Sequence, residues 1–365
     1  MPRVPSKGVS AFEDKQSLLI SHVGAHFSFQ SNINMLIGVN HMGILSDNPR
    51  YHVQFMISVF KMNHAELLVK VIAWEYRVCK YRGIHYDYFP LALKIWRDAV
   101  QTHLNPEDAS PIVGVYDWLL DHNGEFVKIA DSSVPLLIPT LVGWEEPQKS
   151  LLQLLLKGDT TGSLRLANSL VSSPNEYQQF CRQVVQPVMY EIGRLWEHGT
   201  ITAAHEHLAT AIISRVTISL YAPYVSCEPR KGKAVIASVL NEFHELGARM
   251  VADFLEIDGW DVYYLGASIP QDEVIKMIEE IKPDIVGLSV VMPFNLENAR
   301  EMIEKICSHR IRPKVIVGGP VAAYIPDAFS RMGADAYAKS ATDVLFWAQE
   351  VWKAKGIKKN GNRKS

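Results

Sequence analysis

Short apolar runs alternate with amphipathic segments over the last third of the chain. The apolar runs are typical of buried parallel strands, and the amphipathic segments between them predict crossover helices. The expected strands are Lys233–Leu240, Asp261–Leu265, Asp284–Val291, Lys314–Val317 and Asp335–Ala338. This order of elements predicts a doubly wound, five-stranded α/β domain over 233–352. In such a sheet, ligands bind at the carboxyl ends of the strands, beside the point where the strand order reverses.

Apolar residues between 147 and 226 recur instead at the three- and four-residue intervals of a buried helix face. One such stripe runs through Tyr177, Phe180, Val184, Val188, Ile192 and Leu195. Breaks at Gly158–Asp159, at Ser172–Asn175 and at Gly199 leave room for four helices of bundle length. We therefore expect a four-helix bundle over 147–226, joined to the sheet by the polar segment Cys227–Lys233.

Residues 1–146 show helical periodicity around Gln54–Tyr81 and Tyr88–His103, with turn signals at Asn105–Pro106 and Asn123–Gly124. They predict a helical N-terminal domain whose role the sequence leaves open. The histidines of this region have no HExxH or comparable metal-ligand spacing, so each is expected to be structural or exposed. The end of the chain, 353–365, is expected to be a solvated basic tail.

Composition narrows the classes of function. The 365 residues are 48% hydrophobic and include 37 basic and 39 acidic side chains, a balance that does not indicate a nucleic-acid partner. No apolar stretch reaches the roughly 18 residues that a membrane span needs. The N-terminus has no signal-peptide core, so a cytoplasmic protein is expected. The four cysteines form no CxxC pair and are expected to be free thiols.

Candidate ligand-binding residues stand at the carboxyl ends of three of the expected strands or just beyond them. Glu242, His244 and Gly247 form an ExHxxG segment after the first strand, Ser289 and Val291 end the third strand, and Gly318 and Gly319 follow the fourth. A histidine at the carboxyl end of a strand can reach into the ligand crevice, and glycines let a ligand approach the backbone. The serine and the glycine pair alone would also suit a phosphate or flavin loop.

Together these segments resemble the cobalamin-binding fingerprint DxHxxG–SxL–GG of methionine synthase, corrinoid methyl carriers and B12-dependent photoreceptors. The resemblance implies that His244 is the lower axial ligand of cobalt, in place of the cofactor's own dimethylbenzimidazole. It implies that Glu242 accepts a hydrogen bond from the other imidazole nitrogen, which fixes the tautomer and raises the basicity of the ligand. The serine and the glycines would contact the displaced nucleotide tail. The chain departs from the fingerprint with Glu242 for Asp and Val291 for Leu.

A second signature precedes the sheet. The segment that begins at Trp196 resembles WxxGxIxxAxEH, the signature of the four-helix cap over the upper face of cobalamin, and W-x9-EH is typical of B12 photoreceptors of the light-dependent repressor and AerR type. The resemblance implies that the Trp196 indole excludes water above the corrin. Glu206 and His207 would offer a hydrogen-bond acceptor and an alternative cobalt ligand. His198 and His205 are further candidates for that ligand.

These resemblances favour a cobalamin-binding light sensor rather than an enzyme. In that interpretation, light cleaves the Co–C bond of adenosylcobalamin, the cap shifts, and a protein partner receives the signal. The helical N-terminal domain is similar in layout to that of photocobilins, which bind both B12 and biliverdin. The aromatic and histidine residues of His52–His103 would suit a biliverdin pocket, but plain core packing of these residues is the favoured alternative.

The alternative is a corrinoid carrier protein that shuttles a methyl group between two methyltransferases. An interaction scaffold without a cofactor is disfavoured by the intact His244. No direct DNA binding is expected. The sequence is compatible with a homo-oligomer but does not indicate one.

Overall fold

The computed structural model describes residues 1–38, 43–132, 143–225, 231–321 and 325–361 of the chain. Cys227 and the end of the expected basic tail lie outside the described residues. Within the described part, no helix is both long enough and apolar enough to cross a membrane.

The chain divides into two compact units. The first comprises Met1–Leu136 and Arg194–Ile201, and the second comprises Leu137–Gly193 and Thr202–Ser365. The short segment from Arg194 is the end of a long helix whose earlier turns belong to the second unit.

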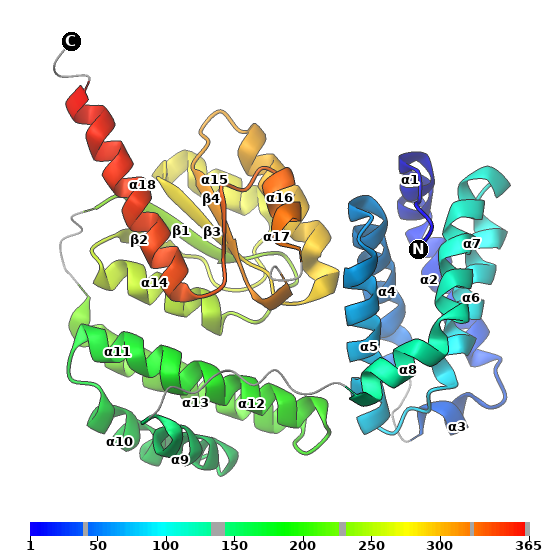
Figure 1. Ribbon diagram of the computed structural model, residues 1–365, viewed down its shortest axis with the longest axis horizontal. Helices are drawn as coiled ribbons and strands as arrows, with labels where there is room; N and C mark the ends of the chain where they lie inside the picture. The colour runs from blue at the N-terminus through cyan, green and yellow to red at the C-terminus, as the bar shows by residue number, and fades with distance from the viewer. Residues whose placement is uncertain (39–42, 133–142, 226–230, 322–324, 362–365) are drawn as a thin grey trace. The chain divides into compact units, whose positions relative to one another are not determined.

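The first unit is helical, as its periodicity predicts (Figure 1). Its helices are α1 (Ser6–Asp14), α2 (Gln16–Ser28), α3 (Ile33–Ile37), α4 (Gly43–Met62), α5 (Ala65–Tyr81), α6 (Tyr88–His103), α7 (Pro106–Asp121) and α8 (Asn123–Ser132). One helix expected around Gln54–Tyr81 is two helices in the structure. Asn63 breaks it with a φ of 50°. His64 then caps α5, because its Nδ1 accepts a hydrogen bond from the Leu67 N–H at 3.1 Å.

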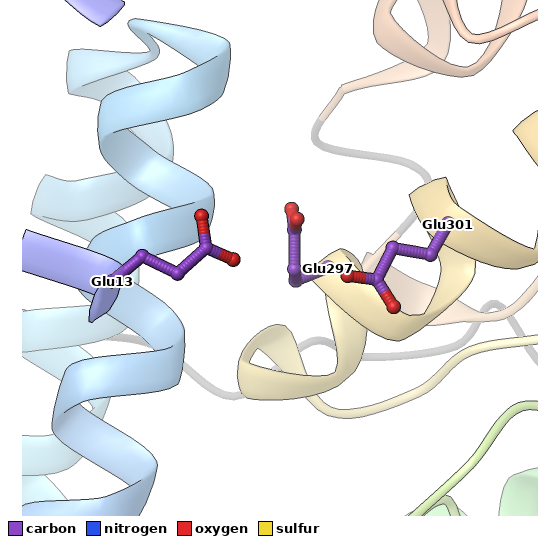
Figure 2. Close-up of side chains that lie close together, drawn as sticks. All are labelled: Glu13, Glu297 and Glu301. Atoms are coloured by element: carbon purple, nitrogen blue, oxygen red, sulfur yellow. The ribbon is translucent and has the colours of Figure 1, made fainter. Parts of the chain in front are cut away.

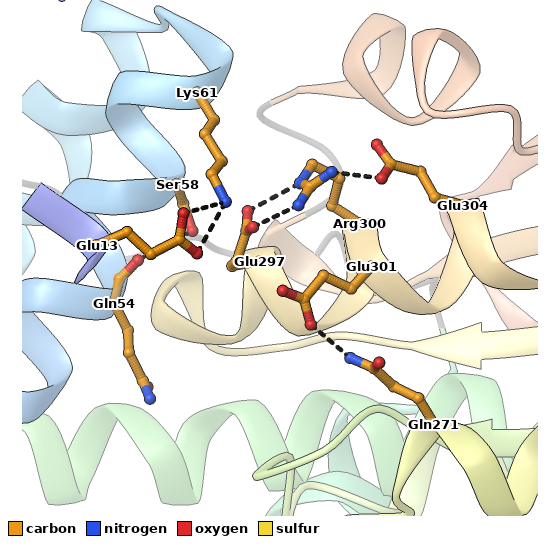
Figure 3. Close-up of polar contacts among 9 residues, drawn as sticks. All are labelled: Glu13, Gln54, Ser58, Lys61, Gln271, Glu297, Arg300, Glu301 and Glu304. Carbon is orange, nitrogen blue, oxygen red and sulfur yellow. Dashed lines mark hydrogen bonds and ion pairs between the residues drawn. The ribbon is translucent and has the colours of Figure 1, made fainter. Parts of the chain in front are cut away.

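An ion pair joins α1 and α4 in this unit. Lys61 Nζ lies 3.0 Å and 2.9 Å from the two carboxylate oxygens of Glu13 (Figure 3). Both side chains are partly buried, so the pair is less screened by solvent than an exposed one. The Glu13 carboxylate is thereby neutralised by its own unit.

The second unit begins with the expected four-helix bundle. Its elements are α9 (Glu145–Leu156), α10 (Thr160–Leu170), α11 (Pro174–Phe180), η1 (Cys181–Val185), α12 (Gln186–Glu197), α13 (Ala203–Tyr221) and the 3₁₀ turn η2 (Ala222–Tyr224). The stripe that begins at Tyr177 forms one long helix through α11, η1 and α12, as predicted, but η1 is a π-helical turn. Gly199 ends this helix with a φ of 65°, a conformation that glycine adopts without strain.

The sheet that follows is parallel throughout, in the order β2-β1-β3-β4-β5. Its strands are β1 (Lys233–Ser238), β2 (Asp261–Tyr264), β3 (Ile285–Ser289), β4 (Lys314–Gly318) and β5 (Ala336–Ala338). The doubly wound α/β fold is therefore confirmed. The strand order reverses between β1 and β3, which places a ligand crevice at their carboxyl ends.

Helices cover both faces of the sheet, as right-handed crossovers require (Figure 1). They are α14 (Leu246–Ile257) and α18 (Ala341–Gly361) on one face, and α15 (Gln271–Ile281), α16 (Leu296–Ser308) and α17 (Pro326–Arg331) on the other, with the 3₁₀ turn η3 (Pro293–Asn295) before α16. Helix α18 continues past Lys353, so much of the segment expected to be a tail is helical.

A buried polar contact ties the bundle to the sheet domain. The Tyr177 hydroxyl on α11 donates a hydrogen bond to Asp253 Oδ2 on α14 at 2.5 Å, and both side chains are buried. Burial raises the pKa of Asp253 to about 6, against the opposing effects of Tyr177 and Arg249. The folded chain therefore holds a proton on Asp253 at a pH where the unfolded chain has lost it.

This proton makes stability depend on pH. Because the folded pKa exceeds the ordinary value of 3.8, the contribution of Asp253 to stability is full below about pH 4 and is lost as pH rises to about 6, a change of roughly 3 kcal/mol. Asp253→Asn keeps an acceptor for Tyr177 and cannot ionise. In urea unfolding experiments, we expect the free energy of unfolding of this variant not to decrease between pH 4 and 6 as it does in the wild type. Asp272→Asn, at an exposed residue paired with Lys305, is the control and should keep the fall. Parallel pH dependence in the wild type and Asp253→Asn would contradict the assignment.

Candidate functional site

A fully buried carboxylate organises the crevice beyond β1. Glu242 is 0% exposed, yet its Oε2 accepts hydrogen bonds from the backbone N–H groups of Val291 and Met292, both at 2.8 Å, and from Asn295 Nδ2 at 3.0 Å. Burial opposes ionisation, but the hydrogen bonds from His244, Met292 and Asn295 outweigh it and lower the pKa of Glu242. The carboxylate is therefore charged and fixed between the loops that follow β1 and β3.

The imidazole of His244 is held by this carboxylate. His244 Nδ1 lies 2.6 Å from Glu242 Oε1, whereas the side chain as a whole is 57% exposed. The hydrogen bond with Glu242 raises the pKa of His244, against the effect of burial, and the charge of Glu206 adds to the rise. Because a carboxylate only accepts, the neutral imidazole keeps its proton on Nδ1. Its Nε2 has no hydrogen-bond partner among the described residues, so its lone pair is available to a ligand.

Small residues at the ends of three adjacent strands line the same edge of the sheet. Ser238, Ser289 and Gly318 are paired in register across β1, β3 and β4. Gly319 follows with a φ of 117°, and a Cβ there would lie 1.9 Å from the Val290 carbonyl oxygen. The backbone segments at the ends of β3 and β4 therefore approach each other so closely that only glycine fits at position 319. Gly247, exposed at the start of α14, has no atom within 4 Å of where its Cβ would be.

Two residues of this region were missed by sequence reasoning. Asn295 is fully buried and donates both to Glu242 and to the Asn241 carbonyl oxygen, at 3.0 Å and 3.1 Å. Ser238 is fully buried, and its hydroxyl has no partner within the described chain. The sequence signal for Ser238 was its place as a small polar residue at the end of an apolar strand. Val291, predicted as a cofactor contact, acts in the structure through its backbone N–H on Glu242.

The bundle contributes a second carboxylate. Glu206, in the first turn of α13, accepts a hydrogen bond from the Thr210 hydroxyl at 2.9 Å and lies 2.7 Å from His207 Nδ1. Its side chain is mostly buried, whereas that of His207 is 81% exposed. The structure therefore joins Glu206 and His207 as a pair. His205 is engaged elsewhere, in the capping box with Thr202 that starts α13.

Trp196 belongs to the first unit, at the end of α12. The Arg82 guanidinium lies 4.0 Å from the centre of its ring. The next two residues also contact α5: Glu197 accepts from Trp74 Nε1 at 2.7 Å, and the His198 ring lies 4.5 Å from that of Tyr81. In these contacts, Trp196 packs the end of α12 against the end of α5. Its place above a corrin stays a prediction.

The acidic face of α16 forms no separate site within the second unit. Glu297 and Glu301 leave this helix one turn apart (Figure 2). Arg300 contacts Glu297 at 2.6 Å and Glu304 at 2.5 Å, and Glu301 accepts from Gln271 Nε2 at 2.8 Å (Figure 3). These carboxylates are thus neutralised or hydrogen-bonded by their own unit.

Comparison with known proteins identifies the two parts of the second unit. The B12 binding domain family matches residues 232–345, and a second B12 binding domain family matches residues 147–220. The first match contains His244, Ser289 and the glycine pair, and the second ends in α13 beyond Glu206. The family assignments therefore cover both the sheet and the bundle.

Individual relatives point the same way. The chain is 33% identical over 165 residues to the trimethylamine corrinoid protein 1 of Methanosarcina mazei, which spans 43% of this chain and 74% of the relative. It is 28% identical over 168 residues to the dimethylamine corrinoid protein 1 of Methanosarcina acetivorans. This match covers 45% of this chain and 78% of the relative. The structure of the Methanosarcina barkeri monomethylamine corrinoid protein matches with a TM-score of 0.50 at 18% identity, over 57% of this chain and all of that one, and supports the fold.

The interpretation as a light sensor is wrong. These relatives are methylamine corrinoid proteins, which favours the carrier alternative over a photoreceptor. The physical reason for the error is that the residues of the W-x9-EH signature make ordinary structural contacts: Trp196 stacks with Arg82 in the first unit, and Glu206 pairs with His207 on α13. Adenosylcobalamin and biliverdin belong to the light-sensor interpretation and are not carried further.

Proposed function

Because this chain belongs to the B12-binding family of corrinoid proteins, we propose that it is a methyl carrier in a methyltransferase system that uses methylamines. The observation that carries the proposal is the His244–Glu242 pair at the carboxyl end of β1. It offers one imidazole nitrogen of defined tautomer at the edge of a sheet that matches the B12 binding domain. We propose that the carrier is not itself a catalyst but presents its cofactor to two partner methyltransferases.

The residues present fit cobalamin. His244 would bind cobalt through Nε2, and Ser238, Ser289 and the glycines at the strand ends would contact the nucleotide tail. The buried Ser238 hydroxyl, which has no partner among the described residues, and the open space above Gly247 are consistent with a ligand in this crevice. When bound, cobalamin supplies a cobalt ion that can accept and release a methyl group.

The chain's own side chains set the strength of the lower ligand. Glu242 holds the Nδ1 proton, so the lone pair of His244 stays on Nε2, and a carboxylate partner makes that nitrogen more basic. Three donors from the β3 loop keep the carboxylate in place. When His244 is not a ligand, the same carboxylate and that of Glu206 stabilise a proton on its imidazole. Glu206 therefore places negative charge on the bundle side of the crevice.

A depletion and add-back assay tests this function. An antibody removes this protein from an extract of the cells that make it. The assay then follows the transfer of labelled methyl groups from trimethylamine to a thiol acceptor. We expect depletion to abolish transfer and the purified, cobalamin-loaded chain to restore it. Chain carrying His244→Ala should not restore it. The proposal would be rejected if the depleted extract still transferred methyl groups from trimethylamine and from dimethylamine as fast as the untreated extract does.

A further inference from the structure

The helical first unit contains a cavity of about 50 Å³ that shares no residue with the Glu242–His244 site. Six aromatic side chains from four helices line it: Phe27 of α2, Phe55 of α4, Tyr76 of α5, and Tyr88, Phe89 and Trp96 of α6. On the scale on which one water needs roughly 10–15 Å³, the cavity has room for about three to five non-hydrogen atoms. It therefore suits a small molecule of compact shape.

One carboxylate, that of Glu75 on α5, also lines this cavity. It has no hydrogen bond or ion pair with any residue that the structure describes. Burial raises the pKa of Glu75 to about 7, so this carboxyl group ionises near neutral pH. His52, which lines the same cavity, does not balance that charge. Burial lowers its pKa to about 3, and its Nε2 lies 3.0 Å from the Tyr116 hydroxyl.

These surroundings select a cation. A carboxylate among apolar groups is unfavourable unless an opposite charge joins it. The faces of aromatic rings are the negative part of their quadrupole, so they attract cations and repel anions. No cationic side chain among the described residues pairs with Glu75, and a ligand can supply the opposite charge.

The chemistry narrows the cation further. A metal ion needs several donor atoms, and Glu75 is the one carboxylate that lines the cavity in the described chain. A primary ammonium carries three N–H donors, of which the single carboxylate would leave some unsatisfied. A dimethylated or trimethylated ammonium instead turns methyl groups toward the rings and has two N–H donors or one. Trimethylammonium, with four non-hydrogen atoms, also matches the volume.

We propose that this cavity binds a small methylated ammonium ion, with its charge against the Glu75 carboxylate and its methyl groups among the six aromatic rings. The cavity lies in the first unit, whereas the proposed cobalamin site lies in the second. Binding of the cation therefore does not depend on the proposed carrier function, and the two are tested separately.

Calorimetric titration of the full chain with trimethylammonium chloride tests the proposal. We expect saturable binding to one site, and binding of uncharged tert-butanol, which has a similar shape, to be at least 10-fold weaker. Glu75→Gln keeps the shape of the side chain and should weaken trimethylammonium binding at least 10-fold. Glu66→Gln is the matched control, because Glu66 lies on the same helix, is exposed and pairs with Lys70 at 2.6 Å. It should bind as the wild type does.

The pH dependence gives an independent readout. The titratable groups around Glu75 are His52 on α4, Tyr76 and Cys79 on α5, and Tyr88 on α6. Burial moves the pKa of each of them away from neutrality. Affinity should therefore rise between about pH 6 and pH 8 as Glu75 ionises, and Glu75→Gln should abolish that rise.

Three results would overturn the proposal: no saturable binding of trimethylammonium, equal binding of tert-butanol, or an unaltered affinity in Glu75→Gln. The comparison of the two ligands uses the wild-type chain, so it remains decisive if a variant fails to fold. The absorption spectrum of bound cobalamin in the same samples reports the other site and should not change.

Discussion

Replacing His244 by alanine is expected to remove the protein nitrogen ligand of cobalt and to weaken cobalamin binding by at least about 100-fold. Loss of a group that merely orients a metal ligand costs roughly 10- to 100-fold in affinity, so loss of the ligand itself should cost more. Titration of the apoprotein with hydroxocobalamin, followed by absorbance, measures the affinity. Electron paramagnetic resonance of the reduced Co(II) form reports the ligand directly. A ¹⁴N ligand splits each cobalt line into three and a ¹⁵N ligand into two.

Labelling decides which nitrogen is bound. In protein made with ¹⁵N-histidine, we expect the three-line pattern of the wild type to become a two-line pattern. His309→Ala, a variant of a histidine of the same unit that lies 3.1 Å from Glu279 and outside the crevice, should keep both pattern and affinity. A three-line pattern in the labelled wild type would show that the cofactor's own base remains the ligand. Retention of the two-line pattern in labelled His244→Ala would assign another histidine.

The sheet and its crevice could be predicted because their signals are local. Apolar runs separated by amphipathic segments define parallel strands, and residues that directly follow such strands must meet at one edge. Glu242 and His244 are two positions apart in one loop, so their contact at 2.6 Å needed no knowledge of distant chain. The longer glutamate arm, in place of aspartate, is accommodated because one carboxylate oxygen contacts the imidazole and the other contacts the β3 loop.

What the sequence did not reveal depends on contacts between distant segments. Asn295 stabilises Glu242 from a 3₁₀ turn more than fifty positions away, and nothing in its local sequence predicts a buried amide. The role of the bundle was misjudged for a related reason. Trp196 and Glu206 match a cap signature in the sequence, but their contacts, with Arg82 and with Thr210 and His207, identify no upper ligand.

The helical first unit shows most clearly which features cannot be predicted from the sequence. Its helices were expected from periodicity, although the break at Asn63 was not, because the apolar pattern continues through it. The lining of the aromatic cavity comes from four helices, and the sequence separates Phe27 from Trp96 by dozens of residues. Glu75 looks from the sequence like one charged position on an amphipathic helix. Its isolation from cations becomes visible only once the helices are packed.

Gly319→Ala is expected to destabilise the second unit by about 2–6 kcal/mol. Two effects add, each of roughly 1–3 kcal/mol: a φ of 117° that a side chain does not tolerate, and overpacking against backbone. The overpacking is severe because the new Cβ would lie 1.9 Å from the Val290 carbonyl oxygen, and Val290 is fully buried beside β3. A loss of this size lowers the melting temperature of a domain of this length by roughly 10 °C. Differential scanning fluorimetry of the apoprotein measures it without involving the cofactor.

The neighbouring glycine provides the matched control. A Cβ on Gly318 would lie 3.7 Å from the Ala338 carbonyl oxygen, an ordinary contact, and its φ is not in the left-handed region. Gly318→Ala should therefore lower the melting temperature by no more than a few degrees in the apoprotein, although both glycines belong to the same proposed slot for the nucleotide tail. If the two variants are equally stable, the close approach of β3 and β4 backbone at Gly319 is refuted. If they differ as expected, the fold itself requires glycine at position 319, whether or not a ligand is bound. A loss of cobalamin affinity in the stable variant Gly318→Ala would then measure how much space the nucleotide tail needs at that position.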